Sequence, residues 1–107
     1  MAKYMIEASY TVEGTKGLVK GGGGTARRAA VQQMLASAGG KIEAFYWAFG
    51  DTDAYVIVDV PDNVTAAALS LAVNGSGFVS LKMTVLLSAE EMDQAAKKSV
   101  TYRPPGS

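Results

Sequence analysis

Four segments of the chain alternate apolar and polar residues, which is the pattern of half-buried strands. The segments are residues 3–11, 41–49, 53–60 and 78–87. In the first of them Tyr4, Ile6 and Ala8 share one side. The second and third are rich in aromatic and β-branched residues and flank Gly50, so they are predicted to form a hairpin.

Apolar residues recur at helical spacing in two segments between these strands. Residues 25–38 are predicted to form a helix that starts with Thr25 as its N-cap and stops at Gly39. A second helix is predicted from Asp62, which follows a proline, to Gly75. The apolar stripe by which it would pack consists of Val64, Ala67, Ala68, Leu71 and Ala72.

The remaining segments give different signals. Residues 11–24 contain six glycines, too many for a regular element, so a loop is predicted there. Ser88 and Glu91 have the spacing of a capping box, which predicts a short third helix that runs to about Lys98. The tail, residues 99–107, ends in two prolines and a short polar stretch, and it is either loose or draped over a neighbouring subunit.

The order of these elements is β-α-β-β-α-β with one appended helix, which predicts an α+β fold of the ferredoxin-like type. Such a fold has an antiparallel sheet with the strand order 4-1-3-2 and carries both main helices on one face. A chain of 107 residues is long enough for one hydrophobic core. We therefore expect one domain over residues 1–98, followed by the tail 99–107.

The other face of the sheet, called the bare face below, is predicted to expose large apolar side chains. A three-residue hairpin loop would pair Trp47 with Tyr55. It would also pair Phe45 with Ile57, and residues paired across strands share a face. Monomers seldom expose so much contiguous apolar surface. We expect this face to contact a second copy of the chain or a small organic ligand through Met5, Phe45, Trp47, Tyr55 and Ile57.

Charged residues are also expected on the bare face. The strand order would bring Lys82 near Glu7, and Glu7 near Asp59. Crowded carboxylates have raised pKa values, so these three residues are candidates for proton transfer in a cavity lined by Trp47 and Tyr55. The alternative is a partly hydrated ion pair at the edge of an interface.

Composition excludes several classes of function. The chain has 10 basic and 10 acidic residues, so no net charge favours nucleic acid or an anionic membrane. It has no cysteine and no histidine, which excludes disulfides, thiolate nucleophiles, the usual zinc sites and Ser-His relays. The N-terminal residues lack an apolar signal segment, and no apolar run is long enough to span a membrane. We expect a cytoplasmic protein without a cofactor.

Two motifs that could bind ions have unsuitable spacing. Asp51 and Asp53 lie at the hairpin turn, whereas Asp59 and Asp62 lie at the other end of the strand, roughly 20 Å away at 3.3 Å per residue. A shared metal site is therefore not expected. Residues 20–28, a glycine-rich stretch before a helix, look like a phosphate-binding loop but lack the P-loop spacing, which favours a flexible loop.

The chain resembles the GYD-domain family from Tyr4 to about Met92. The signals are TVEGTKGL near the start, the GGK-x-E-x-FYW run at 39–47, Gly50 followed by Asp53, and Pro61-Asp62 before an alanine-rich helix. Gly50 and Asp53 keep two positions of the Gly-Tyr-Asp signature, and no tyrosine stands between them. The resemblance implies a small bacterial or archaeal ferredoxin-like domain related to dimeric α/β barrels, in which two sheets pack around a cavity. It implies no settled activity.

Three functions follow from these patterns. The preferred hypothesis is a non-enzymatic homo-oligomeric module whose bare faces pack together and enclose a small-molecule pocket. The first alternative is a cofactor-independent enzyme of the dimeric α/β-barrel type, in which Glu7 or Asp59 transfers protons. The second is a regulatory ring that senses a ligand and assembles through its edge strands.

Overall fold

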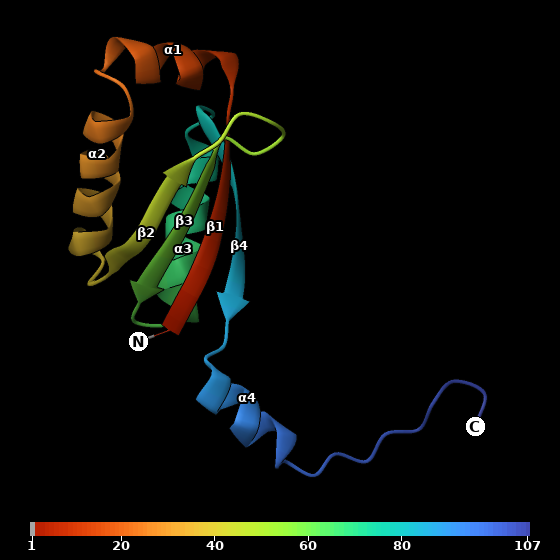
Figure 1. Cartoon of the computed structure of the whole chain (residues 1–107). Coiled ribbons are helices and arrows are strands. Elements are labelled where there is room, and N and C mark those ends of the chain that lie inside the picture. The colour runs from red at the N-terminus through yellow and green to blue at the C-terminus, as the bar shows by residue number, and fades with distance from the viewer. Residues whose placement is uncertain (1) are drawn as a thin grey trace.

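The structure, a computed structural model, describes residues 2–107 (Figure 1). In chain order its elements are β1 (Ala2–Tyr10), α1 (Val12–Lys20), α2 (Gly24–Ser37), β2 (Lys41–Trp47), β3 (Ala54–Val60), α3 (Asn63–Gly75), β4 (Val79–Leu86) and α4 (Ala89–Ala96). The strands form one antiparallel sheet in the order β2-β3-β1-β4. The predicted ferredoxin-like α+β fold and its strand order are confirmed.

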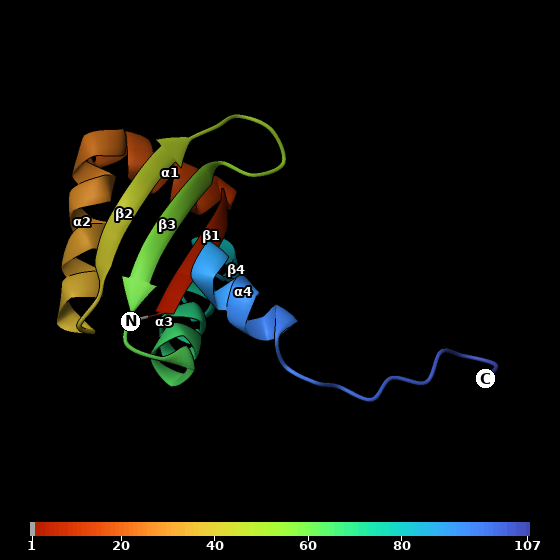
Figure 2. The same cartoon turned by 60° about the horizontal axis from the view of Figure 1, so that its bottom comes forward.

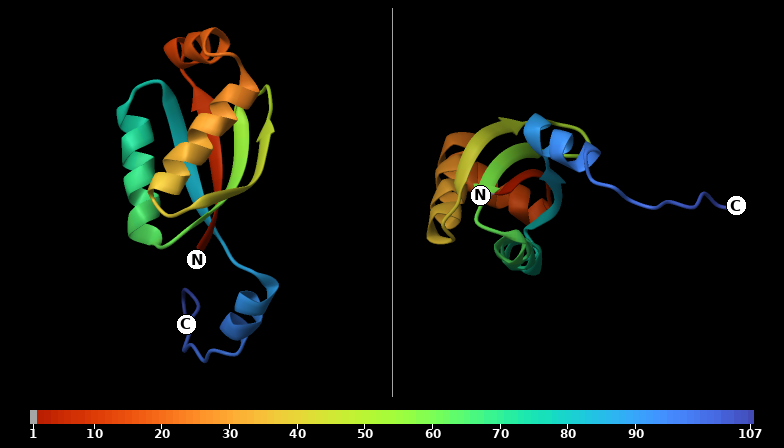
Figure 3. Two further views of the ribbon diagram at one scale, coloured as in Figure 1. Left: turned by 90° about the vertical axis from the view of Figure 1, so that its left-hand side faces the viewer. Right: turned by 90° about the horizontal axis from the view of Figure 1, so that it is seen from below.

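Helices α2 and α3 cover the same face of the sheet, and the hydrophobic core lies between them and the strands (Figure 3). Helix α2 packs along β2, and α3 packs along β4. The alternation of β1 buries Tyr4, Ile6 and Ala8, as predicted, and Leu35 of α2 is fully buried. The buried residues of β3 are Ala54, Val56, Val58 and Val60. Removal of this apolar surface from water stabilises the two-layer arrangement.

The glycine-rich segment after β1 contains a helix, so the prediction of a loop over residues 11–24 is wrong. Thr11 caps α1 by accepting a hydrogen bond from the Gly14 N–H at 3.1 Å. Its own N–H donates to the carbonyl oxygen of Phe78 at 3.0 Å. Gly14 is buried against that same carbonyl group. These contacts with the start of β4 outweigh the low helix propensity of glycine and hold α1 across one end of the sheet (Figure 3).

Two glycines reverse the chain between α1 and α2. Gly22 and Gly23 have φ angles of 103° and 89°, a region that favours glycine. Gly23 is the N-cap of α2 and offers no side chain to accept a hydrogen bond, so the predicted capping by Thr25 is wrong. At the other end, Gly39 has a φ of 78° and stands just beyond the helix, as predicted.

Helix α3 begins as predicted but turns a different side toward the core. Asp62 caps its N-terminus through the side chain, as expected. Ala66 and Leu69 are buried, whereas Val64 is 80% exposed and Leu71 is 75% exposed. The predicted packing stripe is therefore wrong. Four alanines and four larger apolar residues occur around much of this helix, so their spacing does not define one inward side.

A β-bulge in β2 changes the pairing of the hairpin. The register with β3 shifts between Ile42 and Ala44, which leaves Glu43 as the extra residue. Beyond the bulge Phe45 pairs with Val56 and Trp47 pairs with Ala54. The predicted pairs, Trp47 with Tyr55 and Phe45 with Ile57, are wrong. One extra residue reverses the alternation of side chains, so Phe45 and Trp47 lie on the helix-covered face.

The hairpin connection spans residues 48–53 and is longer than the predicted three-residue loop. Asp53 joins it to the end of β1: its N–H donates to the Ala8 carbonyl oxygen at 2.8 Å, and its carboxylate accepts from the Tyr10 N–H at 2.7 Å. The carbonyl oxygen of Asp51 accepts from the Ser9 hydroxyl at 2.8 Å. Both aspartates hold the connection in place, and both lie at the turn, as predicted.

Helix α4 and the tail extend away from the rest of the domain (Figures 1 and 2). The capping box of Ser88 and Glu91 is confirmed, and the helix ends at Ala96 rather than near Lys98. No residue of α4 is buried. The radius of gyration is 16.9 Å, compared with about 13 Å for a compact domain of this length. None of the helices within residues 2–107 is long and apolar enough to cross a membrane.

Candidate functional site

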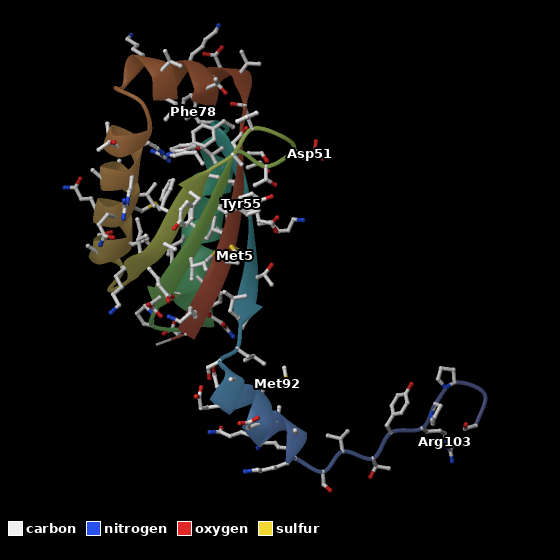
Figure 4. All side chains as sticks on the ribbon, in the orientation of Figure 1. Met5, Asp51, Tyr55, Phe78, Met92 and Arg103 are labelled. Carbon is white, nitrogen blue, oxygen red and sulfur yellow. The ribbon has the colours of Figure 1, made fainter. Side chains whose placement is uncertain are left out.

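The bare face of the sheet is organised in rows by the pairing of its strands. One row across the sheet consists of Tyr46, Tyr55, Glu7 and Lys82. The next consists of Ala44, Ile57, Met5 and Thr84. Tyr46 is 72% exposed and Tyr55 is 41% exposed. Met5 and Tyr55, both labelled in Figure 4, lie on neighbouring strands of this face. The face thus combines an apolar centre with two adjacent tyrosines.

The structure divides the aromatic residues differently from the prediction. Tyr55, Met5 and Ile57 lie on the bare face, as expected. Phe45 instead packs against the core, and Trp47 lies against Gly24 of α2. Tyr46 takes their place on the bare face, and sequence reasoning missed it. The Glu43 bulge is the cause, and no turn residue or break in the pattern of β2 announces it.

Lys3 holds two carboxylates at one end of the bare face. Its Nζ lies 2.6 Å from Oε2 of Glu43 and 3.0 Å from Oδ1 of Asp59. The hydrogen bonds to Glu43 and then to Asp59 raise the pKa of Lys3 above its ordinary value. The Asp59 side chain is 13% exposed. Asp59 is therefore the acceptor in a structural ion pair, and Lys3 is a partner that the sequence prediction did not consider.

The expected approach of Glu7 to Asp59 is wrong. Glu7 pairs with Tyr55, whereas Asp59 pairs with Lys3. The two positions are four residues apart along β3, about 13 Å at 3.3 Å per residue. Lys82 does stand directly opposite Glu7 across β1 and β4, as expected. Among residues 2–107, however, no ion pair within 4.0 Å joins them. The three predicted residues thus do not form one cluster.

A cavity lies on the other side of the sheet, among α1, α2 and α3. Its volume is about 550 Å³. Its apolar lining includes Leu18, Met34, Val73 and Phe78, and its charged lining residues are Glu13 and Arg27. Figure 4 shows Phe78 beneath α1. The cavity was not predicted because it depends on α1, which occupies the segment expected to be a loop.

Three neighbouring aromatic rings lie beside this cavity, and one of them, that of Tyr10, lines it. The ring centroids of Phe45 and Trp47 are 5.3 Å apart, and those of Trp47 and Tyr10 are 5.7 Å apart. Tyr10 lines the cavity, and its hydroxyl oxygen accepts a hydrogen bond from Nε of Arg27 at 3.1 Å. A Cβ atom at Gly24 would lie 2.7 Å from Nε1 of Trp47, so only glycine fits there. Trp47 therefore lies directly against the start of α2.

The acidic residues of the described chain do not converge on an ion. Asp53 bonds the backbone of β1, and Asp62 caps α3. The hydrogen bond from the Thr65 N–H, at 2.8 Å, lowers the pKa of Asp62. Within residues 2–107, no group of three or more metal-binding side chains is arranged to hold a cation.

Comparison with known proteins agrees with the resemblance read from the sequence. The family model described as GYD domain matches residues 4–96. Searches of curated proteins and of solved structures give no match. The matched range extends from β1 to the end of α4 and includes both the bare face and the helix-side cavity. The chain therefore belongs to the GYD-domain family.

Proposed function

We propose that this protein is a non-enzymatic module that assembles with copies of itself through the bare face of its sheet. Tyr46 and Tyr55 carry the proposal. They lie on adjacent strands at directly paired positions, and they are 72% and 41% exposed. Large aromatic side chains of this kind are common anchors of protein interfaces. Within residues 2–107 no helix covers the bare face of the sheet (Figure 1).

The surrounding residues support packing of one sheet against another. Met5 and Ile57 form an apolar centre next to the tyrosines. Charged groups flank this centre at both ends: Lys3, Glu43 and Asp59 at one end, and Glu7 and Lys82 at the other. An apolar centre with a polar rim is the usual composition of an interface, and face-to-face sheets pack about 10 Å apart. The tyrosine hydroxyls would form hydrogen bonds with the partner subunit or with a small organic ligand enclosed between the sheets.

The C-terminal arm, residues 87–107, gives a second reason to expect a partner subunit. Leu87 is 55% exposed and Met92 is 56% exposed, while α4 buries none of its residues. An isolated helix of this length is marginal in water. Contact with a second copy would stabilise it, so we propose that the arm packs on the neighbouring subunit.

The enzymatic alternative would depend on Glu7. This residue stands opposite Lys82 and beside Tyr55, which could orient a substrate. Asp59 is less suited because Lys3 neutralises it. Opposed charges on a sheet occur commonly without any chemistry, so we favour the binding module.

Light scattering of matched variants tests the proposal. The wild type should have at least twice the mass of the 11.1 kDa chain. Tyr46→Asp should reduce it to one chain, because a carboxylate would be buried in the interface. Leu71→Asp is the control, since Leu71 is 75% exposed on the outer side of α3. A monomeric wild type would contradict the proposal. An assembly that survives Tyr46→Asp would favour the ring formed by edge strands.

A further inference from the structure

The helix-side cavity is separate from the bare face and has no role in the proposed assembly. We propose that it binds a small organic carboxylate with an apolar body. The carboxylate would contact Arg27 and Tyr10, and the body would contact Leu18, Met34, Val73 and Phe78. The volume of about 550 Å³ is within the usual range of ligand pockets, about 300–1,000 Å³.

The walls of the cavity select an apolar ligand body. Leu18 comes from α1, Met34 from α2 and Val73 from α3, so each surrounding helix contributes an aliphatic or thioether side chain. Phe78, which directly precedes β4, adds an aromatic ring and is 53% exposed. Ligand sites are mostly apolar with a few convergent polar groups, and this cavity has that composition.

Arg27 supplies the cation. The other charged lining residue, Glu13, points to solvent, with its carboxylate 3.7 Å from Nζ of Lys16 and both side chains about 70% exposed. Among residues 2–107 no ion pair involves Arg27, which is half-buried. Its guanidinium therefore keeps its Nη groups for a ligand. A planar guanidinium matches a carboxylate with two parallel hydrogen bonds.

Tyr10 fixes the orientation of this arginine and can add a third contact. Its hydroxyl oxygen accepts from Arg27 Nε at 3.1 Å. A tyrosine hydroxyl that accepts one hydrogen bond still has its own proton to donate. The Tyr10 ring is held by Trp47 at a centroid distance of 5.7 Å. The two residues thus form a preorganised clamp for one carboxylate, and preorganisation lowers the cost of binding.

The charges favour a monoanion over a nucleotide or polyphosphate. Lys20 and Arg28, the other basic residues of the glycine-rich stretch, do not line the cavity. A polyanion would therefore meet a single arginine, which balances only one negative charge. One carboxylate on an aryl or branched-alkyl body satisfies both the clamp and the apolar walls.

Titration with 3-phenylpropionate, followed by the fluorescence of Trp47, tests this site. Trp47 is the single tryptophan of the chain and contacts Tyr10, so its emission reports binding. The neutral control ligand is 3-phenylpropionamide. We expect saturable binding of the acid at concentrations up to about 10 mM, and affinity for the amide that is lower by about tenfold or more, because hydrogen bonds to a charged group are lost.

Matched arginine variants assign the effect to Arg27. Arg27→Met should abolish the preference for the acid, whereas Arg28→Met should keep it, since Arg28 is exposed and does not line the cavity. If Arg27→Met fails to fold, Tyr10→Phe replaces it. This variant should weaken the binding of the acid more than the binding of the amide. Equal binding of acid and amide, no saturable binding of the acid, or its displacement by inorganic phosphate at lower concentration would overturn the proposal.

Discussion

Gly14 of α1 packs directly against the carbonyl oxygen of Phe78, and a Cβ atom at this position would lie 1.9 Å from that oxygen. Gly14→Ala should therefore push α1 away from the start of β4 and lower the free energy of unfolding by about 1–3 kcal/mol. Gly17→Ala is the matched control in the same helix, because nothing lies within 4 Å of its added methyl group. It should stabilise the protein by about 0.5–1 kcal/mol. Urea unfolding of both variants measures the difference, and equal effects would contradict this packing of α1.

The side on which Phe45 lies can be tested with a second phenylalanine of the same hairpin. Phe45 packs against the core, and Phe49 is fully exposed in the connection. Phe45→Ala should cost about 2–3 kcal/mol, because it removes a ring from a packed environment. Phe49→Ala should stay within about 0.5 kcal/mol of the wild type. Chemical denaturation distinguishes them. A tolerated Phe45→Ala would place this ring on the bare face and argue against the bulge.

Asp62 should make the stability of the protein depend on acidic pH. The Thr65 N–H lowers the pKa of its carboxyl group in the folded state, so its stabilising effect is present above the unfolded pKa and is lost as the pH falls through the folded pKa. Asn caps helices about as well as Asp but does not titrate. Asp62→Asn should therefore match the wild type at pH 7 and show a smaller decline of the urea midpoint below about pH 4. Parallel declines would indicate that Asp62 does not contribute.

Removal of residues 88–107 should weaken assembly of the protein without destabilising the folded subunit. Helix α4 buries no residue in its own chain, so the truncated subunit should keep the thermal stability of its monomer. Loss of the arm should instead raise the dissociation constant of the oligomer by at least about tenfold, if α4 contributes a modest 1.4 kcal/mol to the contact. Sedimentation at several protein concentrations measures both species. An unchanged dissociation constant would exclude the arm from the interface.

The fold could be predicted from the sequence because the strands alternate apolar and polar residues and because α3 and α4 have clear N-terminal caps. Asp62 and the Ser88–Glu91 pair mark helix starts through side-chain hydrogen bonds that depend only on local sequence. Helix α1 depends instead on the contact between Gly14 and Phe78, which are far apart along the chain. Local propensity cannot represent such a contact.

The candidate site was less predictable than the fold, for a different physical reason. Assignment of side chains to faces by alternation assumes that every residue of one strand pairs with one residue of the next. Glu43 has no such partner, so beyond it Tyr46 lies on the bare face in place of Phe45 and Trp47. The side of α3 that faces the core could not be predicted because apolar residues, including four alanines, occur on most sides of the helix. The cavity beside Arg27 required α1, so its clamp could not be inferred from residues 11–24 read as a loop.

The Glu43 bulge also determines which margin of the sheet can accept another strand. Strands β2 and β4 are the two outer strands. An irregular backbone and neighbouring charges, Lys41 and Glu43, interrupt the hydrogen-bonding margin of β2 and discourage strand addition there. The margin of β4 carries no register shift in its pairing with β1 over Val79–Leu86. Of the two margins, that of β4 is thus the more regular template for an added strand.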